Sequence, residues 1–336
     1  MATSDGVAAA LAAPIFMVVG FIFWEQHWKG SALELNIFKC SLASLLCAGT
    51  IAVSTGLAHL AEASGMALNM LVVSSLIGIV VGDLTWLMAL QRIGARRVIV
   101  VDCLAPFIGA VLGRIFLDER IASLGYAGML TTVVGVCLCA LEKEADNEDG
   151  TDRSAVPDRD VLFSGYMLAF VNVFFDAMGA FLTKKWGGPP LDALDITVIR
   201  FGAAAVILLA VYLVMKVPGM ISKQESLEDA FLLYDETKPL LEPGKKEGLV
   251  PASLLGMTRR EWLLVTMGVL LVTCCNPVLY NYALFQIPLA FAITLASFGP
   301  IYAIPLVYLM KGEAVTARSA TGALMAVAGV VMLAQA

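Results

Sequence analysis

Three aspartates lie inside long apolar stretches of the sequence. Asp83 lies in GIVVGDLTWLMAL, one helical turn before Trp86, and Asp102 lies in VVDCLAPF. Asp176 lies in NVFFDAMGAF, one turn after Asn172. An ionisable group within an apolar span is costly, and it usually faces a bundle interior, where it binds a substrate or relays protons. Each aspartate is therefore a candidate for substrate binding or proton coupling, and the alternative is local pairing with a basic side chain or a backbone donor.

Basic, amide and phenol side chains form a second group of candidates. Lys39 and Arg200 end the similar segments ELNIFK and DITVIR. They could attract a carboxylate or phosphate, or extend to the lipid headgroups, as long basic side chains readily do. Asn276, Tyr280 and Asn281 lie in CCNPVLYNYALF, where they could form a polar lining with hydrogen-bonding capacity.

No catalytic set accompanies these residues in the sequence. The chain has two histidines, His27 and His59, and it contains neither HExxH nor Gly-x-Ser-x-Gly. The seven cysteines lie in apolar stretches and lack zinc-binding or disulfide-framework spacing. We therefore expect no enzyme activity, metal or cofactor; the alternative to a transporter is a membrane-embedded receptor or an enzyme without an identifiable catalytic set.

The composition indicates which elements must hold these residues. Of the 336 residues, 59% are hydrophobic and only 15% are charged, and the mean hydropathy is +0.84. Apolar stretches near the length of about 20 residues needed to span a bilayer recur along the chain. We predict an all-α polytopic membrane protein with ten transmembrane helices, at 7–27, 35–57, 66–90, 97–117, 122–141, 161–182, 193–216, 260–284, 288–310 and 314–335.

Two prolines interrupt predicted helices at similar places. Pro106 lies in LAPFIGAVLGRIFLDER and Pro300 in SFGPIYAIPLVYLMKGEA. A proline frees the carbonyl four residues earlier, and such backbone within a membrane needs protein or a wet cavity to satisfy it. Both helices are predicted to bend, either to line a cavity or as packing kinks.

Two polar segments divide the chain. Residues 142–160 form an acidic linker, with eight acids against three bases and no aromatic residue. Residues 218–259 form a long polar loop. We expect a first five-helix repeat at 7–141 and a second at 161–335. The net charge of −6 comes largely from the linker, and no basic face for nucleic acid is present.

The two halves align without gaps when residues 83–142 are shifted by 194 positions. Pro106 then falls on Pro300, Glu119 on Glu313, Gly128 on Gly322 and Gly135 on Gly329. Upstream, a shift of 161 places Lys39 on Arg200. A repeat with an odd number of spans must re-enter the membrane in the opposite orientation, and inverted repeats are typical of secondary transporters.

Residues 82–138 resemble the EamA-type domain of the drug/metabolite transporter superfamily. The resemblance rests on Ala89–Leu90, a small turn at Gly94–Ala95, Pro106, Glu119 and the glycines of the next span, with a second copy at 283–329. The second copy departs by having KGEA where the first has LDER. The resemblance implies a transporter of small polar metabolites that works by alternating access. It does not identify the substrate, because the shared residues are architectural.

The orientation in the membrane has conflicting signals. Basic residues concentrate at the loops after the odd-numbered spans, which places these loops in the cytosol. In the long loop, ETKPLL contains Glu236, Leu240 and Leu241 in the form of a vacuolar or lysosomal sorting signal. Relatives with EamA domains usually keep both termini cytosolic, which would hide this signal. The predicted partners are a metabolite and the lipid bilayer, and the oligomeric state is not predicted.

Overall fold

The computed structural model describes residues 3–28, 32–54, 56, 60, 62–140, 159–215, 257–302 and 317–336. Most of the predicted linker and of the long loop lies outside these residues. The sorting signal at Glu236, Leu240 and Leu241 is therefore outside the described part, as is Glu313. Within the described residues the regular structure is helical, and none of it is strand.

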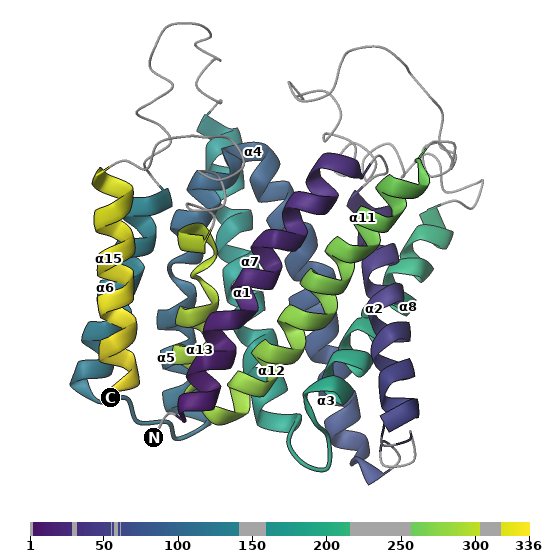
Figure 1. The fold of residues 1–336 in the computed structure, drawn as a ribbon, viewed down its shortest axis with the longest axis horizontal. Helices are drawn as coiled ribbons and strands as arrows, with labels where there is room; N and C mark the ends of the chain where they lie inside the picture. Colours follow the sequence, from purple (N-terminus) through teal and green to yellow (C-terminus); the bar gives the residue numbers. More distant parts are fainter. Residues whose placement is uncertain are drawn as a thin grey trace, which may run out of the picture.

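The helices follow most of the predicted spans (Figure 1). The small turn predicted at Gly94–Ala95, between the spans 66–90 and 97–117, was wrong: the helix at Gly82–Asp102 runs through both residues, because a single glycine is tolerated inside a helix. Two of the helices contain a π-helical segment, in which the backbone hydrogen bonds skip one more residue than in an α-helix. The elements are α1 (Ser4–His27), α2 (Ala32–Ser54), α3 (Gly65–Ser75), η2 (Leu76–Val81), α4 (Gly82–Asp102), α5 (Ala105–Phe116), α6 (Ser123–Ala140), α7 (Arg159–Trp186), α8 (Ala193–Met215), α11 (Arg259–Val269), η4 (Leu270–Cys275), α12 (Asn276–Gln286), α13 (Leu289–Ala296) and α15 (Ala317–Ala334).

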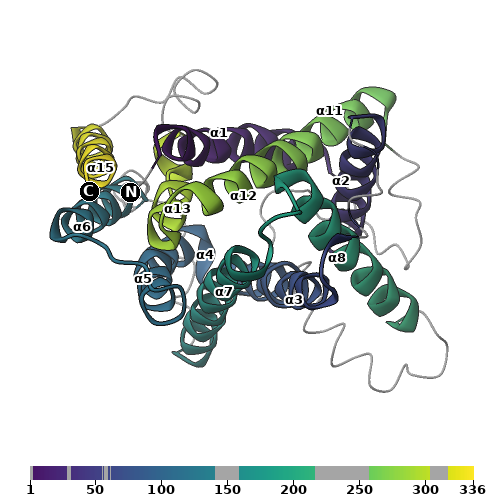
Figure 2. The same ribbon diagram turned by 90° about the horizontal axis from the view of Figure 1, so that it is seen from below.

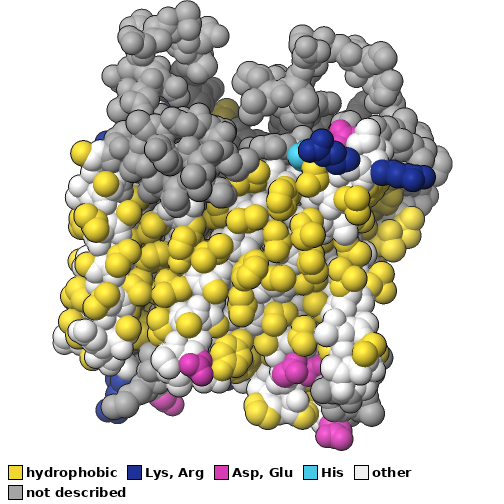
Figure 3. Space-filling view, viewed as in Figure 1, with side chains coloured by type: hydrophobic (Ala, Val, Ile, Leu, Met, Phe, Trp, Pro, Cys, Tyr) yellow, Lys and Arg dark blue, Asp and Glu magenta, His cyan; other side chains and the backbone are white. Residues whose placement is uncertain are grey.

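Seven helical stretches among the described residues are long and apolar enough to cross a membrane. Three further predicted spans contain shorter apolar helices, at Ser123–Cys139, Leu289–Tyr302 and Ala320–Ala334. Figure 3 shows a broad band of hydrophobic side chains across one face, with charged side chains near its two ends. The prediction of a multi-pass membrane protein is confirmed.

The element bounds repeat with the same shifts as the sequence. Three segments of the first repeat, α3, η2 and α6, begin and end 194 residues before their equivalents in the second repeat. These equivalents are α11, η4 and α15, respectively. α2 begins and ends 161 residues before α8. The two repeats therefore share the position of the π-helical segment. They differ after it, because α4 is one helix and the equivalent part of the second repeat is divided into α12 and α13.

Equivalent helices of the two repeats pack against each other in antiparallel pairs. Figure 2 shows α6 beside α15 at one end of the bundle and α2 beside α8 at the other. A Cβ added to Gly128 would lie 2.8 Å from the Gly329 carbonyl oxygen, and one added to Gly135 would lie 2.5 Å from that of Gly322. The order of these contacts is reversed between the helices, and the small residues allow the backbones to approach closely.

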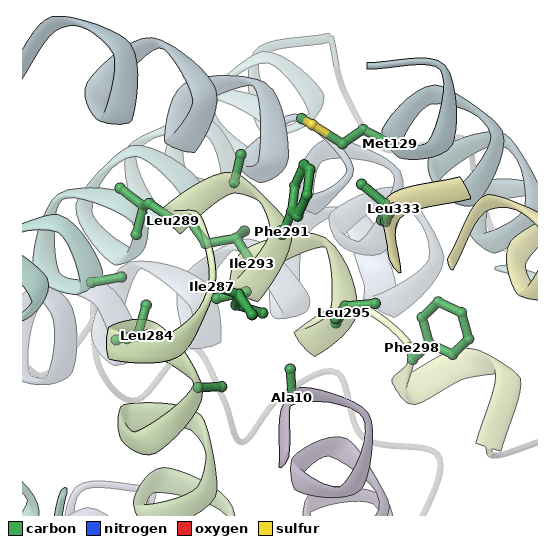
Figure 4. Packing of buried hydrophobic residues seen from close by; sticks show 14 of the residues in the cluster. Ala10, Met129, Leu284, Ile287, Leu289, Phe291, Ile293, Leu295, Phe298 and Leu333 are labelled. Carbon is green, nitrogen blue, oxygen red and sulfur yellow. The ribbon is translucent and has the colours of Figure 1, made fainter. Parts of the chain in front are cut away.

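The largest buried cluster surrounds α13. Leu289, Phe291, Ile293 and Leu295 are buried there, and they meet residues of α1, α5, α6, α12 and α15 (Figure 4). Because α13 is buried on all sides, it is a central element of the bundle. The outer helices instead expose large apolar side chains, as expected of surfaces that face lipid.

Candidate functional site

The π-helical segments place the candidate residues of both repeats at equivalent points. Asp83 lies in the first turn of α4, directly after η2, and Asn276 begins α12, directly after η4. π-Helical turns inside α-helices occur frequently at functional sites. In both repeats, therefore, a candidate residue lies directly after the π-helical segment, where the helix returns to α-helical geometry.

Lys39 and Asp83 form an ion pair between α2 and α4. Lys39 Nζ lies 2.7 Å from Asp83 Oδ2, and the two side chains are 15% and 34% exposed. The sequence suggested either an attraction for anions or extension to the headgroups for Lys39. Its pairing with Asp83 shows that Lys39 points to a neighbouring helix.

Helix α7 has two opposite faces, and Asp176 lies on the inner one. Phe163, Met167, Phe170 and Phe174 are exposed along the outer face. On the opposite face of a helix with 3.6 residues per turn lie Asn172, Asp176, Gly179 and Thr183. Asn172, Gly179 and Thr183 are buried, whereas Asp176 is exposed. The inner face is otherwise covered, so Asp176 retains accessible surface on the side of α7 that packs against the other helices.

Asp176 lies directly beside the junction of η2 and α4. A Cβ added to Gly82 would lie 2.9 Å from Asp176 Oδ1, so glycine leaves room for this carboxylate. The Asn172 side chain donates a hydrogen bond to the Gly82 carbonyl at 3.3 Å. Asn172 therefore fixes the backbone next to Asp83 and is itself buried.

Arg200 extends from α8 toward the same junction. Its guanidinium Nη2 would lie 3.4 Å from a Cβ added to Gly78, and the Ser75 hydroxyl donates to the Arg200 carbonyl at 2.5 Å. Arg200 Nε is buried without a hydrogen-bond partner in the described part of the chain. Nor does the guanidinium form an ion pair with any described carboxylate. A buried charged donor of this kind is costly unless a ligand or water satisfies it.

These side chains form one electrostatic group, which we call the central polar cluster: Lys39, Asp83, Asp176, Arg200 and Tyr280. The charge of Asp176 interacts with those of Asp83, Arg200 and Lys39, and Tyr280 interacts with Asp176 and Arg200. The two basic and two acidic groups balance overall. Only Lys39 and Asp83, however, are joined by a direct ion pair within the described residues.

Asp102 lies at the edge of this group. Its charge interacts with that of Asp176, and no described residue forms a hydrogen bond or ion pair with its carboxylate. It is the last residue of α4, before the break at Cys103 and Leu104.

The helix breaks lie just before the two prolines. α5 begins at Ala105, one residue before Pro106, and α13 ends at Ala296, four residues before Pro300. Two turn residues separate the helical stretches in each repeat, so the freed carbonyls lie at the break and not within a regular helix.

Other predicted residues lie at helix contacts. Trp86 stacks on Phe21 of α1, with ring centroids 6.4 Å apart. Asn281 is buried and donates to the Thr197 hydroxyl at 3.1 Å, which links α12 to α8. Asn276 is partly exposed and lies one turn before Tyr280. The structure thus brings together the cluster residues and leaves Trp86 and Asn281 at its margins.

Sequence reasoning missed a second ion pair, between Glu119 and Lys184. Lys184 Nζ lies 2.8 Å from Glu119 Oε1 and also donates to the Ile287 carbonyl. Glu119 Oε2 accepts from the Leu289 amide at 2.9 Å, at the first turn of α13. Glu119 therefore caps a helix of the other repeat. Only the position of Glu119 at a span end signalled this cap, because Lys184 is distant in sequence.

The arrangement has the polar and charged groups that could bind a polar solute. Asp176, Arg200 and Tyr280 interact electrostatically, which brings together a carboxylate, a guanidinium and a phenol that have no hydrogen bond or ion pair to one another among the described residues. Among the described residues no group of three or more His, Cys, Asp or Glu side chains could hold a metal ion.

Comparisons with known proteins agree with this architecture. A crystal structure of a protein aligns over 99% of this chain and 98% of its own with a TM-score of 0.68 and 12% identity, which shows a common fold. Comparison with curated protein sequences gives no match. A sequence model of the EamA-like transporter family matches residues 4–141 and 163–335, nearly the whole chain in two copies. The chain therefore belongs to the EamA-like transporter family, within the drug/metabolite transporter superfamily.

Proposed function

We propose that this protein is a secondary transporter that moves small polar metabolites across a membrane by alternating access. The observation that carries the proposal is that Arg200 and the accessible Asp176 lie inside an apolar bundle without a direct partner among the described residues. Charged groups at such a position are expensive and mark solute pathways.

The proposed architecture is ten transmembrane helices in two inverted five-helix repeats, at 7–141 and 161–335. The three shorter apolar helices would bring the number of membrane spans from seven to ten. α6 and α15 are equivalent and pack on each other, and α13 continues past its break. Antiparallel packing of equivalent helices is the relation expected of inverted repeats.

The repeats contribute complementary parts of the proposed site. Lys39 and Asp83 come from the first repeat, and Asp176, Arg200 and Tyr280 come from the second. Substrate sites of inverted-repeat transporters lie at the interface between repeats. A relative movement of the repeats would therefore change the distances between the Lys39–Asp83 pair and the three cluster residues of the second repeat, and leave the pair itself intact.

Proton coupling is part of the proposal and rests on the balance of charges. Lys39 is paired with Asp83. The charges of Arg200 and Asp176 interact electrostatically but form no direct ion pair among the described residues. Protonation of Asp176 would leave one uncompensated positive charge in the site. Binding of an anionic solute would then be linked to binding of a proton.

The test is transport by the purified protein in liposomes against a panel of metabolites, with and without a pH gradient. We expect exchange of at least one small polar solute. Asp176→Asn should reduce proton-dependent uptake by about tenfold or more, a difference of about 1.4 kcal/mol or more.

The matched control is Asp160→Asn, which removes an exposed carboxylate from the first turn of the same helix. This variant should transport as the unmodified protein does. Ligand binding or chemical turnover without any solute exchange would instead favour a receptor or an enzyme.

A further inference from the structure

Two cysteines meet at the break between α4 and α5. Cys103 is the first residue of this break, and Cys137 lies on α6. Their sulfur atoms are 3.2 Å apart. Cys103 is buried, whereas Cys137 is partly exposed, so one member of the pair is accessible from outside the protein. The resemblance and the proposed transport function assign no role to this pair.

The geometry is close to that of a disulfide. A disulfide has its sulfur atoms about 2.05 Å apart, so the two thiols need to approach by about 1 Å. On the Cys103 side this approach would take place at the break, because Cys103 and Leu104 lie outside the regular helices. A second pair, Cys47 and Cys274, also interacts, but both residues are buried.

We propose that Cys103 and Cys137 form an oxidation-sensitive thiol pair, for which a peroxide is the oxidant. The thiolate sulfur of one cysteine attacks a peroxide oxygen, which breaks the O–O bond and gives a sulfenic acid and water. The sulfur of the second cysteine then attacks the sulfenic sulfur, forms the S–S bond and releases a second water. The two thiols lose two electrons and two protons in total, and one hydrogen peroxide is reduced to two waters.

The disulfide would restrain the break. Cys103 donates its amide hydrogen bond to Ile99, and Leu104 donates to Val101, so the break is held by local bonds only. α6 is a fixed partner, because Gly128 and Gly135 hold it in backbone contact with α15. A covalent link from Cys103 to α6 would join the break to this helix pair, one residue from Asp102 and three from Pro106.

The chemical test uses the purified full-length protein with hydrogen peroxide, followed by blocking of free thiols and mass spectrometry. Trypsin cleavage after Arg97, Arg114, Arg120 and Lys143 places Cys103 in one peptide and Cys137 with Cys139 in another. We expect these two peptides to be joined after oxidation and separated after reduction. Cys103→Ser and Cys137→Ser should each abolish the joined species.

Cys139→Ser is the matched control on the same helix. Cys139 faces α15, since its sulfur would lie 2.7 Å from a Cβ added to Gly322. This variant should retain the joined peptides, and it also assigns the link to Cys137. Absence of the joined species, or its loss in Cys139→Ser with persistence in Cys137→Ser, would overturn the proposal.

The mechanical part is tested by amide hydrogen exchange, which requires no substrate. Oxidised protein should exchange more slowly than reduced protein at Cys103, Leu104 and the first turn of α5, and Cys103→Ser should show no difference. Equal exchange in the linked and unlinked forms would overturn the restraint. Neither measurement depends on the proposed transport function.

Discussion

At the scale of single residues, the main feature is that charged side chains inside the bundle differ in how they are satisfied. Lys39 and Asp83 neutralise each other directly, whereas Arg200 and Asp176 lack a direct partner among the described residues. A paired charge stabilises the fold, and an unpaired one is available to a ligand. We therefore propose a structural role for the Lys39–Asp83 pair and a solute-binding role for Arg200 and Asp176.

The first prediction concerns the Lys39–Asp83 pair. Lys39→Met should destabilise the protein by about 2 kcal/mol, because it leaves the Asp83 carboxylate uncompensated in a partly buried site. Asp83→Asn should have a similar effect, because it leaves the Lys39 charge uncompensated. The double variant should recover most of the loss. Thermal unfolding in detergent measures all three, and additive losses in the double variant would show that the two residues do not interact.

The second prediction concerns Glu119. Glu119→Gln removes the ion pair with Lys184 but retains an oxygen that can accept from the Leu289 amide. Glu119→Ala removes both contacts and leaves the Lys184 charge partly buried. We therefore expect losses of about 1 and 3 kcal/mol, respectively. Arg120→Ala, which alters the adjacent residue, is the control, and a larger loss for the glutamine than for the alanine variant would contradict this role.

At the scale of elements, the sequence predicted the repeats well because their markers are chemically distinctive. Proline, glycine and glutamate at one shift identified the register, and α6 and α15 begin and end at that same shift. The π-helical segments η2 and η4 were not predicted, since LIGIVV and LLVTCC carry no local signal for an extra residue in the turn.

The sequence also could not predict the directions in which the charged side chains point. In a span that is apolar on all sides, hydrophobic periodicity does not distinguish an inner from an outer face. Asp83 and Lys39 are 44 residues apart, and only the packing of α2 against η2 brings Lys39 to the first turn of α4. For α7, by contrast, the structure resolves an inner face through the burial of Asn172 and Thr183.

The third prediction belongs to the contact between α6 and α15. Gly135→Ala should destabilise the protein by about 1–3 kcal/mol, because its Cβ would lie 2.5 Å from backbone atoms of Gly322 and Ala326. Gly49→Ala is the control within a helix, since nothing lies within 4 Å of a Cβ there. Loss of helicity on heating measures both, and equal behaviour of the two variants would show that the helices can move apart without cost.

At the scale of the whole molecule, charge is distributed unequally between the two ends of the bundle. Both termini lie at one end in Figure 1. The charged residues of the described helix ends and turns at that end are Asp5, Glu62, Arg114, Asp118, Glu119, Arg120, Lys184, Lys185, Asp192 and Asp195. Those at the opposite end are Glu34, Arg92, Arg97, Arg159, Asp160, Arg259, Arg260, Glu261 and Arg318. Basic residues therefore prevail only at the end opposite the termini, and Lys184 is neutralised by Glu119.

The last prediction follows from this asymmetry. Loops rich in lysine and arginine remain in the cytosol during membrane insertion, so the end with the six described arginines should be cytosolic and both termini should lie on the other side. In sealed vesicles with the cytosolic face outward, a protease should cleave a tag inserted in the 218–259 loop and spare a tag at the C-terminus. Detergent should make both tags cleavable. Cleavage of the C-terminal tag alone in intact vesicles would reverse the orientation, and it would also place the Glu236, Leu240 and Leu241 signal on the side where no cytosolic receptor could bind it.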